Sequence, residues 1–258
     1  MALPNFFTLQ KNVPNSTAKP VVIWDLDGTI LDESLYKDCA QQVFFDVFNV
    51  VLTDDEYEKH FAQNSYCQRA THQYLDVKNV PSYDRPVLTS VFELIDLRYQ
   101  ELIRAGLVKT INGAVELISN LHKQGYRQCL VTGSSRLLVD DVLDLIVPDL
   151  FEVIVTSENT FWQKPHQHPY DLCFKMLDIE PTQAIVIENS IEGVRSAVES
   201  GAITISTNNT IVVPEELRAN GAFAVIDVSE LNTDLISLIF EHANKTLKQP
   251  ISTPIISQ

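Results

Sequence analysis

The chain has 258 residues, of which 45% are hydrophobic, and a formal net charge of −15 at pH 7. This length allows one large core, or a core domain with a smaller lobe. The acidic balance argues against nucleic acid or an anionic membrane as a partner, because both require a basic surface. A small anionic substrate is compatible with it if a cation offsets the local field.

The two ends of the chain and its cysteines bear on its location. Residues 1–18 show no basic segment followed by an apolar one, so we expect no secretory signal there. We interpret residues 1–18 and 247–258 as disordered tails. No apolar stretch approaches the ~18 residues that cross a bilayer. The four cysteines form no CxxC pair, which is typical of reduced thiols, so we expect a cytoplasmic protein without a membrane partner.

The first predicted strand is the apolar run Val21–Trp24, which ends in Asp25-Leu26-Asp27-Gly28-Thr29. A continuous apolar run is typical of a strand buried on both faces of a parallel sheet. Open α/β sheets bind ligands at the carboxyl ends of their strands. Two carboxylates there repel each other unless a cation or a proton intervenes. The pattern indicates a catalytic metal site; the alternative is a turn in which one aspartate caps the next helix.

Residues 33–108 carry helical patterns and no credible strand. Apolar side chains recur at helical spacing from Leu35 to Val47. The sequence Thr53-Asp54-Asp55-Glu56 forms a capping box that opens a second helix. A third helix begins near Pro86, and its apolar face extends to Ile103. We interpret this block as an inserted helical cap domain.

From Asn112 onward, helices alternate with strands. We predict strands at 127–132, 153–156, 184–188, 202–206 and 224–228, and helices at 113–124, 136–146, 169–178, 190–200 and 233–244. This alternation implies βαβ units and a parallel sheet. The predicted fold class is therefore α/β, with helices on both faces of a core formed by residues 19–32 and 109–246.

Three further polar clusters follow predicted strands: Thr132-Gly133-Ser134-Ser135, Lys164-Pro165 and Glu188-Asn189-Ser190. A hydroxyl and free N–H groups at a helix start form an anion cradle. A lysine can neutralise charge between an acid and a phosphate, and carboxylate and amide oxygens suit a hard cation. Each cluster alone also fits a helix cap or a surface lysine. Their shared position at strand ends favours a functional site.

Together these motifs resemble those of the haloacid dehalogenase (HAD) superfamily, over roughly residues 20–245. Residues 164–170 are similar to the family's Lys-Pro-x-Pro-Asp-Pro-Tyr segment, and residues 187–197 to its Glu-Asp-Ser-x-x-Gly-Val-x-Ala-Ala segment. Residues 33–108 resemble the helical (C1) cap of the subgroup that contains phosphoglycolate phosphatase and β-phosphoglucomutase. The resemblance implies a Rossmann-like core with an inserted all-α cap.

The resemblance also implies a Mg²⁺-dependent phosphatase acting on a small phosphorylated metabolite. Asp25 would be the nucleophile that forms an aspartyl phosphate, and Asp27 the general acid and base. Charge on the transferring group would be stabilised by Thr132, Gly133 and Lys164. The implied Mg²⁺ ligands are Asp25, Asp27 through its carbonyl, Glu188 and Asn189.

Three departures from the family pattern keep alternatives open. Asn189 stands where most relatives have Asp, His168 stands where they have Asp before the proline, and Gln163 where they have Gly before the lysine. The loss at His168 concerns a helix cap with proline in the first turn. The alternatives to a phosphatase are a phosphosugar mutase and an inactive scaffold that binds or regulates. The carboxylate of Asp27 favours phosphoryl transfer over dehalogenation.

The cap would select the substrate in such an enzyme. Residues 61–65 lack the glycine and basic side chains expected of a phosphomutase cap loop, which favours a hydrolase. The candidates for facing the substrate from the cap are Lys37, Asn64, Ser65 and Arg69. The alternative for each is ordinary helix surface. We expect a monomer or a weak dimer.

Overall fold

The computed structural model describes residues 19–61, 68–81, 85–207 and 212–247. The predicted tail 1–18 and nearly all of the predicted tail 247–258 lie outside this part of the chain. In the described residues, no helix is both long and apolar enough to cross a membrane. Cys39, Cys129 and Cys173 are buried free thiols.

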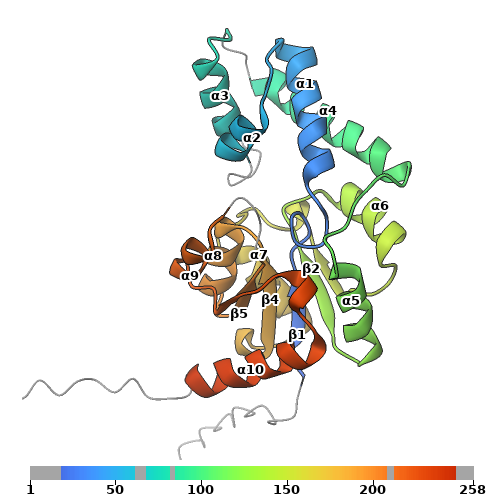
Figure 1. Ribbon diagram of the computed structural model, residues 1–258, viewed down its shortest axis with the longest axis vertical. Coiled ribbons are helices and arrows are strands. Elements are labelled where there is room, and N and C mark those ends of the chain that lie inside the picture. Colours follow the sequence, from blue (N-terminus) through green and yellow to red (C-terminus); the bar gives the residue numbers. More distant parts are fainter. Residues whose placement is uncertain (1–18, 62–67, 82–84, 208–211, 248–258) are drawn as a thin grey trace, which may run out of the picture.

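A six-stranded parallel sheet forms the centre of the molecule (Figure 1). Its spatial order is β3 (Val153–Val155), β2 (Gln128–Val131), β1 (Val21–Trp24), β4 (Ala184–Glu188), β5 (Ile203–Ser206) and β6 (Ala224–Val225). On β1, Ile23 lies opposite Cys129 on one side and Val186 on the other. The winding of the chain therefore reverses at β1, and open α/β sheets bind ligands outside such a switch point.

Helices cover both faces of this sheet, as predicted. On one face lie α5 (Ala114–Lys123), α6 (Arg136–Ile146) and α10 (Thr233–Leu247), and on the other α7 (His168–Leu177) and α8 (Ile191–Glu199), with α9 (Pro214–Ala219) beside α8. Val22 and Trp24 belong to the first core, and Val21 and Ile23 to the second. Burial on both faces explains why β1 is a continuous apolar run.

Short 3₁₀ helices occupy Ser157–Asn159, Pro181–Gln183 and Val228–Glu230. The last of these shortens the predicted strand 224–228, of which only Ala224–Val225 pairs in the sheet. The carbonyl of Asp227 accepts a hydrogen bond from the N–H of Glu230 at 3.0 Å, which turns the chain away from the sheet.

In the described part of the chain between β1 and α5, four helices form what we call the helical lobe: α1 (Ser34–Phe48), α2 (Asp54–His60), α3 (Gln68–Val77) and α4 (Arg85–Arg104). No strand occurs in the described residues of this stretch. The predicted capping box is present, since Thr53 and Glu56 exchange hydrogen bonds. Helix α3 was not predicted, because its mostly polar sequence hides the short apolar stripe that buries Tyr74 and Leu75.

The lobe has its own aromatic core. The ring of Phe44 lies 5.6 Å from Phe48, 5.4 Å from Phe61 and 5.9 Å from Tyr74, measured between centroids. All three contacts are edge-to-face, the geometry that aromatic pairs prefer. Phe44 is fully buried. The lobe is therefore held together by side chains that the sheet does not contribute.

The lobe joins the core through two segments that lie side by side. The N–H of Asp32 donates to the carbonyl of Lys109 at 3.0 Å, and the N–H of Ile111 donates to the carbonyl of Ile30 at 2.8 Å. Helix α4 also contacts α6, because the Asp141 carboxylate accepts hydrogen bonds from the side chains of Gln100 at 2.8 Å and Arg104 at 3.1 Å.

Candidate active site

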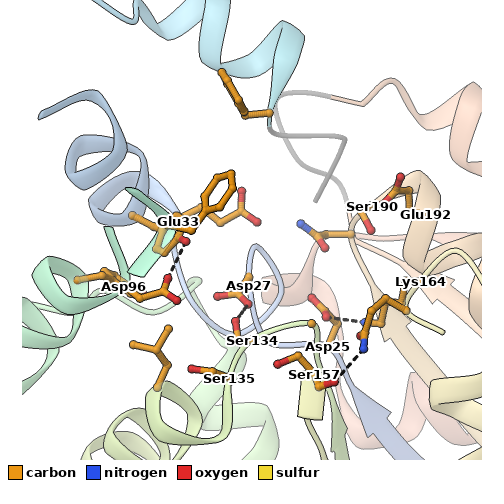
Figure 2. Close-up of a pocket in the computed structure, with 18 of the residues that line it drawn as sticks. Asp25, Asp27, Glu33, Asp96, Ser134, Ser135, Ser157, Lys164, Ser190 and Glu192 are labelled. Atoms are coloured by element: carbon orange, nitrogen blue, oxygen red, sulfur yellow. Dashed lines mark hydrogen bonds and ion pairs between the residues drawn. The ribbon is translucent and has the colours of Figure 1, made fainter. Parts of the chain in front are cut away.

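The two aspartates after β1 are held by a tight loop. The N–H of Asp25 donates to the carbonyl of Ile187 on β4 at 3.0 Å, which continues the sheet pairing by one residue. The N–H groups of Ile30 and Leu31 then both donate to the carbonyl of Leu26, at 2.8 and 2.9 Å. This turn directs Asp25 and Asp27 into the same pocket (Figure 2).

Lys164 bridges two buried carboxylates. Its Nζ lies 2.7 Å from Asp25 Oδ1 and 2.6 Å from Glu188 Oε1, and it also donates to the carbonyl of Val131 at 2.9 Å. Burial and the Glu188 carboxylate raise the pKa of Asp25 to about 7, while Lys164 acts in the opposite direction. Burial disfavours the charged form of Lys164, but both carboxylates outweigh it and raise the pKa of this lysine. The lysine therefore stays charged and favours the ionised form of Asp25.

Glu188, at the end of β4, is completely buried and accepts hydrogen bonds at both oxygens. Oε1 accepts from Lys164 and, at 2.8 Å, from the hydroxyl of Tyr170; Oε2 accepts from the N–H of Asn189 at 3.1 Å. A Cβ at Gly193 would come within 2.0 Å of the Glu188 carboxylate. The start of α8 therefore requires glycine at this point for the carboxylate to fit beneath it.

Asp27 is held by the loop after β2. Its Oδ2 accepts a hydrogen bond from the hydroxyl of Ser134 at 2.5 Å and a longer one from Thr132 at 3.4 Å. The N–H of Ser134 donates back to Thr132 Oγ1 at 3.0 Å. Burial raises the pKa of Asp27, and the Ser134 hydrogen bond acts against it. A raised pKa suits a group that must carry a proton before it transfers it.

The oxygens around Asp25 fit a hard cation. The side chain of Asn189 packs over Gly28, where a Cβ would lie 1.9 Å from the Asn189 amide nitrogen. Asp25, Asp27 and Asn189 therefore share one pocket. Among the residues that the structure describes, no three His, Cys, Asp or Glu side chains form a metal-binding group by themselves. A cation here would be held by Asp25 together with main-chain and amide oxygens and water. Mg²⁺, which binds oxygen ligands through one or two carboxylates and keeps several waters, fits this set.

A cavity of about 410 Å³ opens between the core and the lobe, and these residues lie at its core side (Figure 2). On the core side, Gly133, Ser134, Ser135, Lys164 and Asn189 also line it. The lobe contributes Glu33, Tyr36, Tyr57, Phe61, Phe92, Asp96 and Tyr99. Burial, followed by the Asp27 and Asp25 carboxylates, raises the pKa of Glu33 to about 8. Acidic groups therefore lie on both sides of the cavity.

All the predicted site residues of the core domain lie together in the structure. The four predicted cap residues have different outcomes. Lys37 does not line the cavity; its Nζ pairs with Asp54 at 3.2 Å within the lobe. Asn64 and Ser65 lie outside the described residues. Arg69 belongs to α3, but its side chain lies outside the described part of the chain. The substrate contacts predicted for the last three stay predictions.

Sequence reasoning missed the lobe's acidic lining residues, Glu33 and Asp96. A signal for Asp96 is present, because it stands in the apolar stripe of α4 between Phe92 and Tyr99 at helical spacing. An acid in such a stripe either pairs with another group or faces a cavity. Ser134 and Tyr170 lie within motifs singled out from the sequence, but their contacts depend on packing.

The structure bears on two of the three departures from the family pattern, Gln163 and His168. The Gln163 side chain donates to the carbonyls of Ser157 at 2.9 Å and Thr160 at 2.7 Å, which anchors the loop that carries Lys164. His168 is the first residue of α7 and not its cap, which is Gln167. The expected cap position was therefore wrong by one residue.

The motifs and the geometry agree with comparisons to known proteins. A family model described as haloacid dehalogenase-like hydrolase matches residues 22–207. Pyrophosphatase PpaX of Bacillus mycoides (strain KBAB4) is 22% identical over 209 residues, covering 80% of this chain and 91% of that protein. Protein CbbY of Rhodobacter capsulatus is 23% identical over 215 residues, covering 80% of this chain and 90% of that protein.

Solved structures show the same fold. CbbY from Rhodobacter sphaeroides in complex with phosphate superposes with a TM-score of 0.73 at 20% identity, covering 83% of this chain and 96% of that one. A mutant of that protein was solved with xylulose-(1,5)bisphosphate. A predicted phosphoglycolate phosphatase from Haemophilus somnus 129pt superposes with a TM-score of 0.70 at 17% identity, covering 82% and 96%.

Proposed function

The chain belongs to the haloacid dehalogenase-like hydrolases, and on that premise we propose that it is a Mg²⁺-dependent phosphatase of a small phosphorylated metabolite. The observation that carries the proposal is the pair Asp25 and Asp27 at the end of β1, with Lys164 bonded to Asp25 at 2.7 Å. Relatives named as a pyrophosphatase, or solved with phosphate and a sugar bisphosphate, support the substrate class.

In the proposed first step, an oxygen of Asp25 attacks phosphorus and the bond from phosphorus to the ester oxygen breaks. Lys164 favours the ionised, nucleophilic form of Asp25 and offsets charge on the transferring group. Asp27 gives its proton to the departing ester oxygen, so the leaving group departs as an alcohol. Ser134 holds Asp27 through Oδ2 during this transfer.

In the second step, the Asp27 carboxylate takes a proton from water, and the water oxygen attacks phosphorus. The bond between phosphorus and Asp25 breaks, which releases inorganic phosphate and restores both side chains. The N–H of Gly133, in the loop between β2 and α6, is suited to hold a phosphoryl oxygen together with Thr132 and Lys164. The lobe excludes bulk water while transfer proceeds.

The charge of the site supports a divalent cation. The carboxylates of Asp25 and Glu188 meet a single lysine, so a phosphate dianion would meet net repulsion even while Asp27 carries its proton. Bound Mg²⁺ would supply positive charge at the phosphoryl oxygens. Asp25, the Asp27 carbonyl and Asn189 would hold it. Because both oxygens of Glu188 already accept hydrogen bonds, we assign Glu188 to supporting Lys164 and the backbone before α8.

A screen of phosphorylated metabolites with Mg²⁺, scored by release of inorganic phosphate, tests the proposal. Asp25→Asn is expected to reduce turnover to below a few per cent with an unchanged circular dichroism spectrum. Asp144→Asn, an exposed aspartate on α6, is the matched control and is expected to keep full activity. Beryllium fluoride with Mg²⁺ is expected to inhibit the wild type, because it mimics a phosphoryl group on a carboxylate.

Two outcomes would contradict the proposal. Appearance of an isomer of the substrate without net release of phosphate would identify a mutase. Absence of phosphate release across the screen, together with no Mg²⁺ binding at millimolar concentration, would identify a scaffold that binds without catalysis.

A further inference from the structure

The lobe side of the cavity combines aromatic rings with carboxylates. Tyr36 and Tyr99 meet edge to face with centroids 5.1 Å apart, and Phe92 lines the same wall. The hydroxyl of Tyr36 donates to Asp96 Oδ1 at 2.8 Å, the contact drawn beside Asp96 in Figure 2. Glu33 lines the cavity next to them. We call these five residues the lobe wall.

The carboxylates of the lobe wall have no positive partner among the described residues. Neither Glu33 nor Asp96 takes part in an ion pair, and the Glu33 carboxylate accepts no hydrogen bond from the described part of the chain. Lys164 is the one lysine or arginine among the described lining residues, and Asp25 and Glu188 already engage it. Partly buried carboxylates are costly without a cation opposite them.

Aromatic ring faces beside a carboxylate are the features that recognise an organic ammonium group. The ring quadrupole attracts a cation, and the attraction increases where water is excluded. Because Tyr36 donates its hydroxyl hydrogen to Asp96, the ring and the carboxylate are held on the same side of the cavity. A second phosphate or a carboxylate at this wall would instead be repelled by the Asp96 carboxylate.

We propose that the substrate's leaving group is a small organic cation, so that the substrate is the phosphomonoester of an amino alcohol or a quaternary ammonium alcohol. This inference rests on the proposed phosphatase function and specifies its substrate class. The phosphate lies at Asp25 and Lys164, and the cation lies against the lobe wall. A cavity of about 410 Å³ is within the range that holds one small molecule.

A matched pair of substrates tests the effect of the positive charge at nearly constant shape. Phosphocholine and 3,3-dimethylbutyl phosphate have nearly the same shape, but only the first carries a positive charge. With full-length protein and Mg²⁺, kcat/KM is expected to be about ten- to thirtyfold higher for phosphocholine, the preference that a desolvated cation–π site supplies. p-Nitrophenyl phosphate is included as a general phosphatase substrate.

Variants of α4 locate the origin of the preference. Asp96→Asn is expected to lower the ratio of the two kcat/KM values to below threefold. Glu93→Gln removes the same charge from an exposed position on the same helix and is expected to leave the ratio within twofold of wild type. This control separates a contact at the lobe wall from the general field of an acidic protein.

The outcomes distinguish this inference from the function on which it rests. Equal kcat/KM for the two substrates would overturn the inference that the leaving group is a cation. Hydrolysis of p-nitrophenyl phosphate without hydrolysis of phosphocholine would do the same. Neither result would contradict the proposed phosphatase function. An unchanged ratio in Asp96→Asn would also overturn it. No phosphate release from any of the three compounds, while another metabolite of the screen is hydrolysed, would overturn this inference alone. No release across the whole screen, with no Mg²⁺ binding, would overturn the phosphatase and this inference with it.

Discussion

The core side of the cavity holds Asp25 and Glu188 against a lysine, whereas on the lobe side Asp96 accepts a hydrogen bond from a tyrosine. Asp25 and Glu188 follow or end strands, so backbone pairing on both sides of β1 sets their positions. Glu33 and Asp96 depend on how α1 and α4 pack. Under the proposed function, the sheet edge would perform the chemistry and the lobe would select what is attached to the phosphate.

The largest expected effect concerns whether the lobe is a separate folding unit. Phe44→Ala removes the centre of its aromatic core and is expected to destabilise the lobe by about 3–5 kcal/mol. Hydrogen exchange should show lost protection in α1, α2 and α4, with protection in β1 and β4 retained. Phe45→Ala, at a half-exposed ring on the same helix, is the control and should change stability by less than about 0.5 kcal/mol. Equal loss of protection in the sheet would show one cooperative unit.

The next effect concerns the lysine of the core side. Lys164→Met is expected to lower kcat by about 10²–10³-fold, as loss of one transition-state stabiliser does. The loss should be equal for phosphocholine and its neutral isostere, because Lys164 contacts the core side alone. Lys175→Met, exposed on α7, is the control. A fall in kcat smaller than threefold, or a changed ratio between the kcat values for the two substrates, would contradict the assignment of catalysis to the core side and of substrate selection to the lobe.

A smaller effect is expected at the metal site. Asn189→Asp adds a formal charge to the proposed cation ligands and should tighten Mg²⁺ binding about tenfold, because hard-cation affinity follows ligand charge. Calorimetric titration of Mg²⁺ measures this without turnover. Asn232→Asp adds the same charge at an exposed position before α10 and should leave the affinity unchanged. If the wild type binds no Mg²⁺ at millimolar concentration and Asn189→Asp does, the phosphatase assignment is wrong.

The smallest effect concerns the contact between the two regions. Asp141→Asn weakens the hydrogen bonds from Gln100 and Arg104 and should cost about 0.5–1 kcal/mol, as expected for a partly exposed charged contact. Amides in the last turn of α4 should then exchange about two- to fivefold faster. Asp144→Asn, one turn away on α6, should not alter their exchange. Unchanged exchange in Asp141→Asn would mean that the paired connecting segments alone position the lobe.

The core side of the site could be predicted from sequence because strand ends have few possible positions. Once β1, β2 and β4 were identified as parallel strands, the residues after each had to meet at one edge. The lobe offers no such rule, since a helix can turn any face toward the cavity. Lys37 is predicted to face the substrate from the cap, yet it pairs with Asp54 on the lobe. The position of Asp96 in the apolar stripe of α4 indicates that it faces inward, but only the packing of α4 decides that it meets this cavity.

The paired segments 30–32 and 109–111 have an evolutionary consequence. Because the chain leaves the core and returns to it within hydrogen-bonding distance, everything between the two points resembles an insertion into one surface loop. Insertions at such places are tolerated because they leave the parent fold's backbone contacts intact. In the course of evolution, the helical lobe can therefore be replaced by another one while the core, with the residues at its strand ends, stays unchanged. Grafting a foreign four-helix segment between Asp32 and Lys109 would reproduce that history in the laboratory.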